Sequence, residues 1–415
     1  MKAKTPKLIL GLIIIMFLIF IPVDLNDNFS TGSSESVDSK IAGSYILSYI
    51  HINDLSSNNW SYTADTFAWC SGNGSFIDPY VIQDCVVNAA TSPTGSGILI
   101  ENSKSAYFVV KNCSAFNADG DSSTIYAGIK LENTNNGSIK NCTVYNNYLS
   151  GIILKYCTNN TITNNTIIDN QNGIYLFTSV SNFITCNTIV DNNNEGLIMV
   201  APDTGDTIGN TIVDNVIDNN HNGIHTSIYC NYNLILNNTL NGNDYGIDLQ
   251  SSHNIIAGNI VNNTFNYGIF LRSSENNVIN NVMIGNKIGI HVSLCLNNFV
   301  ANNTIENSTL NGIRMSGGDG NVVLNNRIKY SNDTGIRLLH KSDNNEILNN
   351  VITNSTFYCI YVEADCSNNT FEGNSCLPTY EPVNNGQFIE GFPIYFIIII
   401  ITLTSTVFFW KKKKF

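Results

Sequence analysis

Short apolar runs recur along most of the chain, separated by asparagine, glycine and serine. Within each run apolar and polar positions alternate, as in a β-strand that buries one face. The stretch from 273 to 292, SSENNVINNVMIGNKIGIHV, contains three such runs and ends in Gly-Ile-x-Val. The pattern predicts three short strands in this stretch, with Ile290 and Val292 facing the core and His291 facing solvent.

This unit recurs at a nearly constant spacing. Each copy has an anchor position, usually glycine, followed by Ile-x-Leu or a close variant, and successive anchors are 21 to 31 residues apart. Such a period indicates a solenoid whose rungs pack only on their neighbours. We therefore predict an all-β, parallel β-helix of about 12 rungs over residues 70–377. The anchors are Gly97, Gly128, Gly151, Gly173, Gly196, Gly223, Gly246, Gly268, Gly289, Gly312, Gly335 and Cys359.

Polar positions of the unit recur as well. One asparagine slot predicts a column of amides that bond to one another at tight corners, where asparagine tolerates left-handed dihedral angles. The anchor glycines are expected to serve another such corner. In the first rungs, Cys85, Cys113 and Cys142 take equivalent places and predict a column of thiols, with or without a disulfide. The asparagines are Asn165, Asn187, Asn215, Asn238, Asn259, Asn281, Asn303, Asn326 and Asn350.

A more specific motif precedes the first rung. Residues 72–75 read Gly-Asn-Gly-Ser and residues 78–82 read Asp-Pro-Tyr-Val-Ile. This entry, together with the Asn-Asn-x-Ile and Gly-Ile-x-Leu units, resembles right-handed parallel β-helix domains of the NosD and pectate-lyase-like type over about residues 70–377. The resemblance implies a prokaryotic surface protein, of a type common in archaea. It implies no single reaction, because the family includes carbohydrate-binding proteins, lyases, epimerases and hydrolases.

The two ends of the chain differ from the repeat. Three lysines precede an apolar run that ends at residue 23, which predicts a signal peptide or an N-terminal anchor over residues 1–23. Residues 24–69 are expected to form a spacer and an N-terminal cap over the first rung. After a linker at 378–391, residues 392–410 carry no charge and are followed by four lysines. This end predicts a transmembrane helix with a cytoplasmic basic tail at 411–415, and places the β-helix outside the cell.

The charge distribution limits the partners of the exterior part. Seven of the 20 Lys and Arg lie in the two ends, so the rest of the chain carries 13 basic and 32 acidic residues, a net charge of −19. A nucleic-acid partner is therefore not expected. The chain has five methionines and no Cys-x-x-Cys motif. We therefore predict no metal site and no cofactor.

The outward positions of the Gly-Ile-x-Leu-x strands should stack into two columns on one sheet. The columns are apolar from Ile153 to Val200, so we expect the insertion at 201–209 to cover that part. They are polar from His225 to Arg337. The first column reads Leu99, Lys130, Ile153, Tyr175, Ile198, His225, Asp248, Phe270, His291, Arg314, Arg337 and Tyr361. The second reads Glu101, Glu132, Lys155, Phe177, Val200, Ser227, Gln250, Arg272, Ser293, Ser316, Leu339 and Glu363.

Planar donors beside aromatic faces suit an extended glycan chain. A lyase or epimerase needs a base and a charge neutraliser, which a histidine and an arginine would supply. A glycoside hydrolase is disfavoured, because neither column has a second carboxylate within four rungs of Asp248. The ligand-binding candidates are Tyr175, His225, Asp248, Gln250, Phe270, Arg272, His291, Arg314 and Arg337. The catalytic candidates are His225, Asp248, His291, Arg272 and Arg314.

The sequence thus leaves three functions open. The first is a membrane-anchored extracellular surface protein that binds polysaccharide or an envelope partner on its outward sheet face. The second is a polysaccharide lyase or epimerase that uses the patch from His225 to Arg314. The third is a structural coat or spacer protein, in which the repeat provides only a rigid rod.

Overall fold

The computed structural model describes residues 45–120, 125–202 and 205–377. The predicted signal peptide, linker, transmembrane helix and basic tail lie outside these residues. In the described part of the chain, no helix is both long enough and apolar enough to cross a membrane. The helical elements there are α2 (Trp60–Thr66) and the short 3-10 helix η1 (Ala89–Thr91).

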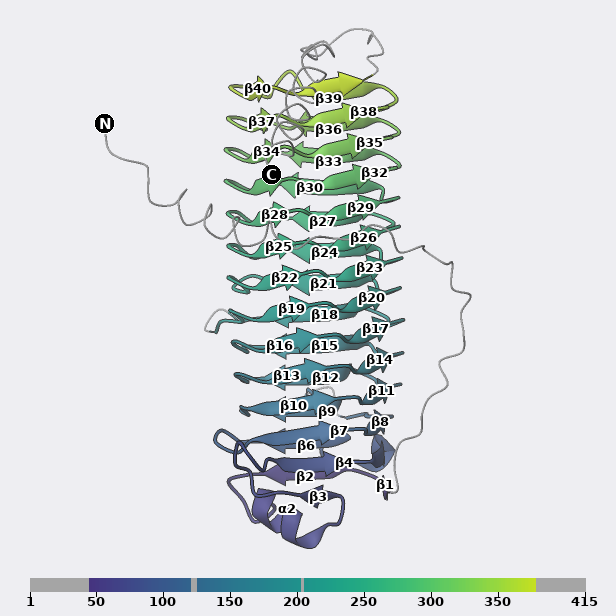
Figure 1. Ribbon diagram of the computed structural model, residues 1–415, viewed down its shortest axis with the longest axis vertical. Helices are drawn as coiled ribbons and strands as arrows, with labels where there is room; N and C mark the ends of the chain where they lie inside the picture. Colours follow the sequence, from purple (N-terminus) through teal and green to yellow (C-terminus); the bar gives the residue numbers. More distant parts are fainter. Residues whose placement is uncertain (1–44, 121–124, 203–204, 378–415) are drawn as a thin grey trace, which may run out of the picture. The chain divides into compact units, whose positions relative to one another are not determined.

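The chain winds through three sheets, so that each rung adds one strand to each sheet (Figure 1). Sheet A comprises β1 (Tyr45–Leu47), β5 (Cys85–Asn88), β8 (Ser114–Phe116), β11 (Thr143–Tyr145), β14 (Thr166–Ile168), β17 (Thr188–Val190), β20 (Val216–Asp218), β23 (Thr239–Asn241), β26 (Ile260–Asn262), β29 (Val282–Ile284), β32 (Thr304–Glu306), β35 (Arg327–Lys329), β38 (Val351–Thr353) and β41 (Ser375–Leu377). Sheet B comprises β2 (Ile50–Asn53), β6 (Ile98–Glu101), β9 (Ala127–Glu132), β12 (Ser150–Lys155), β15 (Asn172–Phe177), β18 (Glu195–Val200), β21 (Asn222–Thr226), β24 (Tyr245–Leu249), β27 (Tyr267–Leu271), β30 (Ile288–Ser293), β33 (Asn311–Ser316), β36 (Thr334–Leu339) and β39 (Tyr358–Val362). Sheet C comprises β3 (Cys70–Ser71), β4 (Tyr80–Gln83), β7 (Phe108–Lys111), β10 (Gly137–Lys140), β13 (Thr161–Thr163), β16 (Phe183–Thr185), β19 (Thr211–Val213), β22 (Leu234–Leu236), β25 (Ile255–Ala257), β28 (Asn277–Ile279), β31 (Phe299–Ala301), β34 (Val322–Leu324), β37 (Glu346–Leu348) and β40 (Thr370–Glu372).

The predicted all-β, parallel β-helix is confirmed. Sheet B has 13 strands, and each of the 13 − 1 = 12 strands after β2 contains or directly follows one predicted anchor. Ile290 and Val292 are fully buried, as the alternation predicts, whereas His291 between them lies on the outer side of the sheet but is not open to solvent, at 6% exposed. The inward residues of all three sheets form one continuous hydrophobic core along the solenoid. Each fully buried isoleucine or leucine contributes roughly 1.5 to 3 kcal/mol.

The predicted asparagine column lines the corner between sheets C and A. In a typical step, Nδ2 of Asn281 donates to Oδ1 of Asn303 at 3.0 Å and to the carbonyl of Ile256 at 2.9 Å. The left-handed residue of this corner is the one before the column member, for example Asn280 with φ 57°. The prediction that the column asparagine itself is left-handed was therefore wrong. In the Asn-Asn pair, Asn280 adopts the left-handed conformation and Asn281 makes the hydrogen bonds of the column.

The anchor glycines are not left-handed corners either. Among the described residues with positive φ none is an anchor. A Cβ on Gly312 would instead lie 2.4 Å from Cγ2 of Ile328 and 2.7 Å from the carbonyl oxygen of Gly335. The glycine is therefore required by close approach of the core and the next rung. Cys359 takes the anchor position of the last sheet B strand, where it forms a disulfide with Cys376.

The column of Cys85, Cys113 and Cys142 is present as buried free thiols. The backbone N–H of Cys142 donates to Oδ1 of Asn165 at 2.9 Å. The thiols therefore continue the asparagine column of the C–A corner downward, and small weakly polar side chains replace amides in the first rungs.

Residues 45–69 close the N-terminal end of the solenoid and also extend it. β1 and β2 pair in parallel with β5 and β6, so this segment adds strands to sheets A and B. Below them, α2 directs Trp60 into the end of the core, where the side chain is 1% exposed. The indole stacks on Tyr80 with ring centroids 5.0 Å apart, and its Nε1 donates to Oγ of Ser103 at 2.8 Å.

Candidate functional site

The first predicted column exists as a continuous register on sheet B. Each member pairs directly with the next, from Leu99 and Lys130 at one end to Arg337 and Tyr361 at the other. In the second column, Phe177 pairs with Val200 and Ser293 with Ser316. The outward face is therefore assembled as the repeat spacing predicts.

A third column flanks these two and was not predicted. Its members directly precede the anchor glycines and include Glu195, Asn222, Tyr245, Tyr267 and Asn311. From β9 onward the sheet B strands begin one residue before the anchor, and ring contacts place this column beside the first one. The ring of Tyr267, for example, lies 4.6 Å from that of Phe270 between centroids. A strand start at residues such as Tyr245 and Tyr267 could have been found from their aromatic, strand-favouring character.

The polar half of the face contains an aromatic platform. The rings of Phe270 and His291 stack with centroids 4.8 Å apart and an interplanar angle of 6°. Tyr267 meets His291 edge to face at 4.8 Å. The guanidinium of Arg272 lies 4.3 Å from the centre of the Phe270 ring, within cation–π range. These contacts join four residues of two adjacent rungs into one contiguous surface, the platform of Tyr267, Phe270, Arg272 and His291.

A buried carboxylate lies next to this platform. Asp248 is 2% exposed, and its Oδ2 lies 3.1 Å from a terminal nitrogen of Arg272 and 3.2 Å from Nδ1 of His225. The histidine contact lacks the alignment of a hydrogen bond. On the other side of His225, Glu195 accepts from Nδ2 of Asn222 at 3.1 Å. Burial raises the pKa of Glu195, although nearby His225 and Asn222 oppose the shift.

The arginines differ in their pairing. Arg337 binds Asp333 at 2.7 Å, and its guanidinium lies 5.2 Å from the centre of the Tyr361 ring. Arg314 has no acidic partner within ion-pair distance among the described residues. The candidates Tyr175 and Gln250 lie in the predicted columns. Tyr175 is four rungs from Phe270, so it does not contact the platform.

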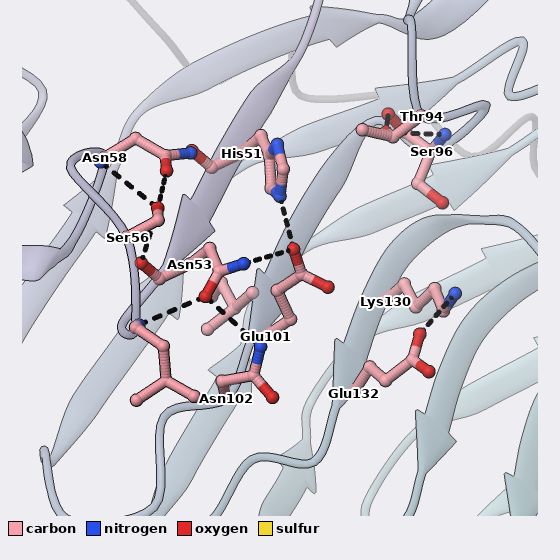
Figure 2. A network of polar contacts seen from close by, with 12 residues as sticks. His51, Asn53, Ser56, Asn58, Thr94, Ser96, Glu101, Asn102, Lys130 and Glu132 are labelled. Carbon is pink, nitrogen blue, oxygen red and sulfur yellow. Dashed lines mark hydrogen bonds and ion pairs between the residues drawn. The ribbon is translucent and has the colours of Figure 1, made fainter.

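The other end of the face is paired within the protein. Figure 2 shows His51 and Asn53 of the cap at Oε1 of Glu101, at 2.8 and 2.9 Å. Lys130 binds Glu132 at 2.7 Å in the same view. Burial acts to raise the pKa of Glu132, but its lysine partners Lys130 and Lys155 lower it overall. Polar groups at this end are thus already satisfied.

The apolar rungs lie between these two ends. Ile153 is fully buried although it faces outward, whereas Tyr175 and Val200 are half-buried. The described contacts of the insertion at 201–209 are at the corner between sheets B and C. Thr207 there is buried and donates to the carbonyl of Val200 at 2.7 Å. The insertion is therefore part of that corner. Its described contacts do not include the outward residues of the apolar rungs that it was expected to cover.

Unpaired polar atoms concentrate on sheet B. Within the described residues, 15 buried side-chain nitrogen and oxygen atoms have no hydrogen-bond partner, and ten of them belong to sheet B residues. Buried polar groups are normally paired, and each unpaired one costs about 1 to 3 kcal/mol. The ten atoms belong to Ser150, Glu195, Asn222, His225, Asp248, His291 with both ring nitrogens, Asn311, Arg314 and Arg337.

His291 is held neutral at physiological pH. Burial lowers its pKa to about 3, and the nearby guanidinium groups of Arg314 and Arg272 add to the effect. The folded protein therefore resists protonation between pH 6.5 and 3, whereas the unfolded chain takes up a proton near pH 6.5. Above pH 6.5 the ring is neutral in both the folded and the unfolded state. As the pH falls from 6.5 towards 3, only the unfolded chain binds the proton, so the free energy of unfolding decreases.

We expect this difference to appear as acid sensitivity that His291→Gln reduces. Each pH unit below 6.5 should cost the wild type up to about 1.4 kcal/mol through this residue. The measurement is urea unfolding of both proteins at pH 7.5, 6.0 and 5.0. A His221→Gln variant is the control, because the side chain of His221 is half exposed and pairs with Asp244. Equal pH dependence of wild type and His291→Gln would contradict this assignment.

Solved structures with this fold were found at low sequence identity. A mannuronic-acid-specific polysaccharide family 6 lyase from human gut microbiota is 11% identical with a TM-score of 0.50, over 71% of this chain and 85% of the lyase. A mutant of the periplasmic alginate epimerase AlgG is 15% identical with a TM-score of 0.48, over 79% of this chain and 83% of the epimerase. The catalytic domain of a GH87 alpha-1,3-glucanase is 16% identical with a TM-score of 0.47, over 70% of this chain. The chain spans 58% of that domain, and these likenesses concern the fold alone.

No curated protein matches the sequence. A family model described as periplasmic copper-binding protein (NosD) matches residues 53–244 and 207–391. The described residues do not fit a copper site, because no three His, Cys, Asp or Glu side chains among them converge as ligands. His221 contacts Asp244, and His225 contacts Asp248, so these side chains form two separate pairs and not one ligand cluster. The absence of a cofactor stays a prediction.

Three methionines lie in the described part, and all of them are fully buried in the core. The copper named in the family description therefore has no counterpart in the donors that these residues present. The match itself spans most of the sequence and coincides with the β-helix. On this evidence, the chain belongs to the NosD family of right-handed parallel β-helix proteins.

Proposed function

We propose that this protein is anchored in the membrane, faces outward from the cell, and binds a polysaccharide of the cell envelope or its surroundings on the outer face of sheet B. The observation that carries the proposal is the concentration of unpaired polar atoms on that face. These atoms are covered in the unbound protein, so we expect side chains of this face to move on binding. A chain rich in hydroxyl groups would then supply both the donors and the acceptors that the atoms need. The described residues outside sheet B hold the other five of the 15 atoms.

The platform of Phe270, His291 and Arg272 suits the same ligand. Sugar rings present apolar faces that pack on aromatic rings, and their hydroxyl groups bond to planar polar side chains at the edges. Neighbouring rungs are about 4.8 Å apart, so an extended ligand along the solenoid axis would meet a new set of side chains at each rung. Polysaccharide is also the ligand class in the name of the lyase that shares the fold.

Binding should depend on Arg314 and Phe270. We expect Arg314→Ala to weaken binding at least about tenfold, because loss of a charged hydrogen bond costs about 1.5 to 3 kcal/mol. The test is a glycan array with full-length protein, followed by titration of the best ligand. Arg327→Ala is the matched control, because Arg327 is an outward arginine on sheet A. Absence of binding to any glycan, or binding that Phe270→Ala and Arg314→Ala leave unchanged, would refute the proposal.

A lyase or epimerase activity is the second candidate, and the group formed by His225, Asp248 and Arg272 favours it. Asp248 lies beside both His225 and Arg272, which places a histidine base near a cation. The low pKa of His291 makes it a weak base, so His225 is the better candidate for this role. Incubation with uronate polymers should then yield an unsaturated product or altered uronate stereochemistry, and His225→Gln should abolish the change. Unchanged polymers across a broad panel would exclude this activity.

Anchoring is proposed from the uncharged stretch at 392–410 and the four lysines that follow it. Full-length protein should remain in the membrane fraction after washing with alkaline carbonate, and a chain truncated after residue 391 should be released. Release of the full-length chain would refute the anchor. A protein that is anchored, binds no glycan and leaves uronate polymers unchanged would leave the structural coat or spacer as the remaining function.

A further inference from the structure

Sheet C has an apolar outer face that is separate from the candidate glycan site. It extends over six consecutive strands, from β19 to β34. Ten of its twelve outward residues are apolar and none is charged, which is unusual for an outer sheet face. Seven of the ten are partly exposed, whereas Ala257, Ile279 and Ala301 are buried. We call this the sheet C patch. Its outward residues are Thr211, Val213, Leu234, Leu236, Ile255, Ala257, Asn277, Ile279, Phe299, Ala301, Val322 and Leu324.

The patch is not a general result of the repeat. Sheet A strands of the same rungs carry outward charges at Asp218, Glu306, Arg327 and Lys329. The rung above the patch carries an exposed glutamate, Glu346. Inward positions need apolar residues to build the core, but outward positions do not. The apolar outward residues of sheet C therefore need a separate explanation.

Exposed apolar residues also occur on the corner between sheets B and C, on either side of an exposed ion pair of His253 with Glu275 at 3.0 Å. Directly before β22, Ile228 is 50% and Tyr232 is 59% exposed. Directly before β31, Leu294 is 81% and Leu296 is 47% exposed. Six strands span roughly 29 Å, and sheet plus corner are roughly 20 Å wide, which gives on the order of 600 Å². Two such surfaces would bury on the order of 1,200 Å², the lower end for a specific protein interface.

We propose that two copies of this protein associate through their sheet C patches. The charge of the chain favours a second copy as the occupant. The part of the chain between its two ends carries a net charge of −19, so most contacts between two copies would bring acidic surfaces together. A face without charge is one through which identical acidic molecules can approach without this cost. It is also self-complementary, as a two-fold interface requires.

The geometry of the solenoid suits this contact. The strands of each sheet stack in register along the axis, as Figure 1 shows. Two sheets of this kind pack face to face about 10 Å apart, and their outward side chains interdigitate. Sheet B is a different face of the same rungs, so the dimer would use none of the residues of the glycan platform. The association is therefore independent of the proposed glycan binding.

Cysteine cross-linking of the full chain in its membrane tests the dimer. Asn277 lies on β28, near the middle of the patch, so Asn277→Cys places a thiol close to the expected two-fold axis. The exposed Cys186 is replaced by serine in all variants, to remove a competing thiol. A flexible bis-maleimide should then link two copies of the Asn277→Cys protein. The matched control is Val282→Cys, which lies in the same rung on the outer face of sheet A.

The expected result is a covalent dimer for Asn277→Cys, at least about five times the yield of the Val282→Cys control. Leu234→Glu should reduce this yield to the control level, because it places two carboxylates in the apolar contact. Val322→Glu on another strand gives a second, independent disruption, and protease resistance verifies that each variant is folded. Three results would overturn the proposal: no dimer, equal yields at residues 277 and 282, or a cross-linked product whose mass is not that of two copies.

Discussion

Replacement of Trp60 by alanine should lower the free energy of unfolding of the N-terminal rungs by about 3 to 5 kcal/mol. The indole is 1% exposed and stacks on Tyr80 with an interplanar angle of 3°. It also lies 5.0 Å from the ring of Phe108. Its removal opens a cavity at the end of the core and leaves Oγ of Ser103 without the indole donor. Among the described residues no rung lies below to compensate, since β2 is the first strand of sheet B there.

The effect should be local at first, because a solenoid holds together through contacts between neighbouring rungs. Hydrogen exchange followed by mass spectrometry is therefore the appropriate measurement. Peptides that cover β4, β6 and β7 should exchange much faster in Trp60→Ala, while peptides from β30 to β36 should change little. Tyr62→Ala is the control, because this residue of the same helix is 49% exposed. Unchanged exchange in β4 and β7 would show that the cap does not stabilise the first rungs.

The repeat spacing was sufficient to predict the architecture and the register. In a solenoid every rung reuses the same contacts, so one period places residues as distant as Leu99 and Tyr361 in one column. This is why all pairings of the first outward column were correct. The core was predictable for the same reason, since inward residues such as Ile290 follow from alternation alone.

The parts that failed depend on where each strand begins and on local backbone geometry. The Gly-Ile-x-Leu-x pattern places the start of the outward strand at the anchor glycine, so it does not assign Tyr245 and Tyr267, which precede that glycine, to the face. In sheet B the register passes from Ser150 to Ile152 in pairing with β15 without a partner for Gly151. Such an irregularity at glycine has no signal in the apolar pattern.

The protonation and the pairing of the site residues depend on side-chain packing, which the order of residues in the two columns does not show. The neutrality of His291 arises because Tyr267 and Phe270 enclose the ring and two arginines lie near it. Arg314 has no acidic partner within the described ranges, and this is likewise a result of side-chain geometry, since Asp333 on the next rung binds Arg337 instead. Sequence could therefore name the residues of the face, but not their protonation or pairing.

The two members of one Asn-Asn pair should differ sharply in their effect on stability. Asn281 is 1% exposed, and its Oδ1 accepts from both the backbone N–H and Nδ2 of Asn259, at 2.9 and 3.0 Å. Its Nδ2 donates to the rung on either side. Asn281→Ala leaves several of these buried partners unpaired, so we expect it to destabilise the protein by about 3 kcal/mol or more.

Asn280 should tolerate replacement by glycine with a change of no more than about 0.5 kcal/mol. Its side chain is exposed, and its φ of 57° is one that glycine adopts without strain. Gly258 and Gly373 already occupy the equivalent place in other rungs, with φ of 67° in both. Urea unfolding of Asn281→Ala and Asn280→Gly beside the wild type gives the comparison. Asn280→Ala should fall between them, because alanine in the left-handed region costs about 1 to 2 kcal/mol. If Asn281→Ala were as stable as the wild type, the amide column would be a consequence of the fold and not one of its supports.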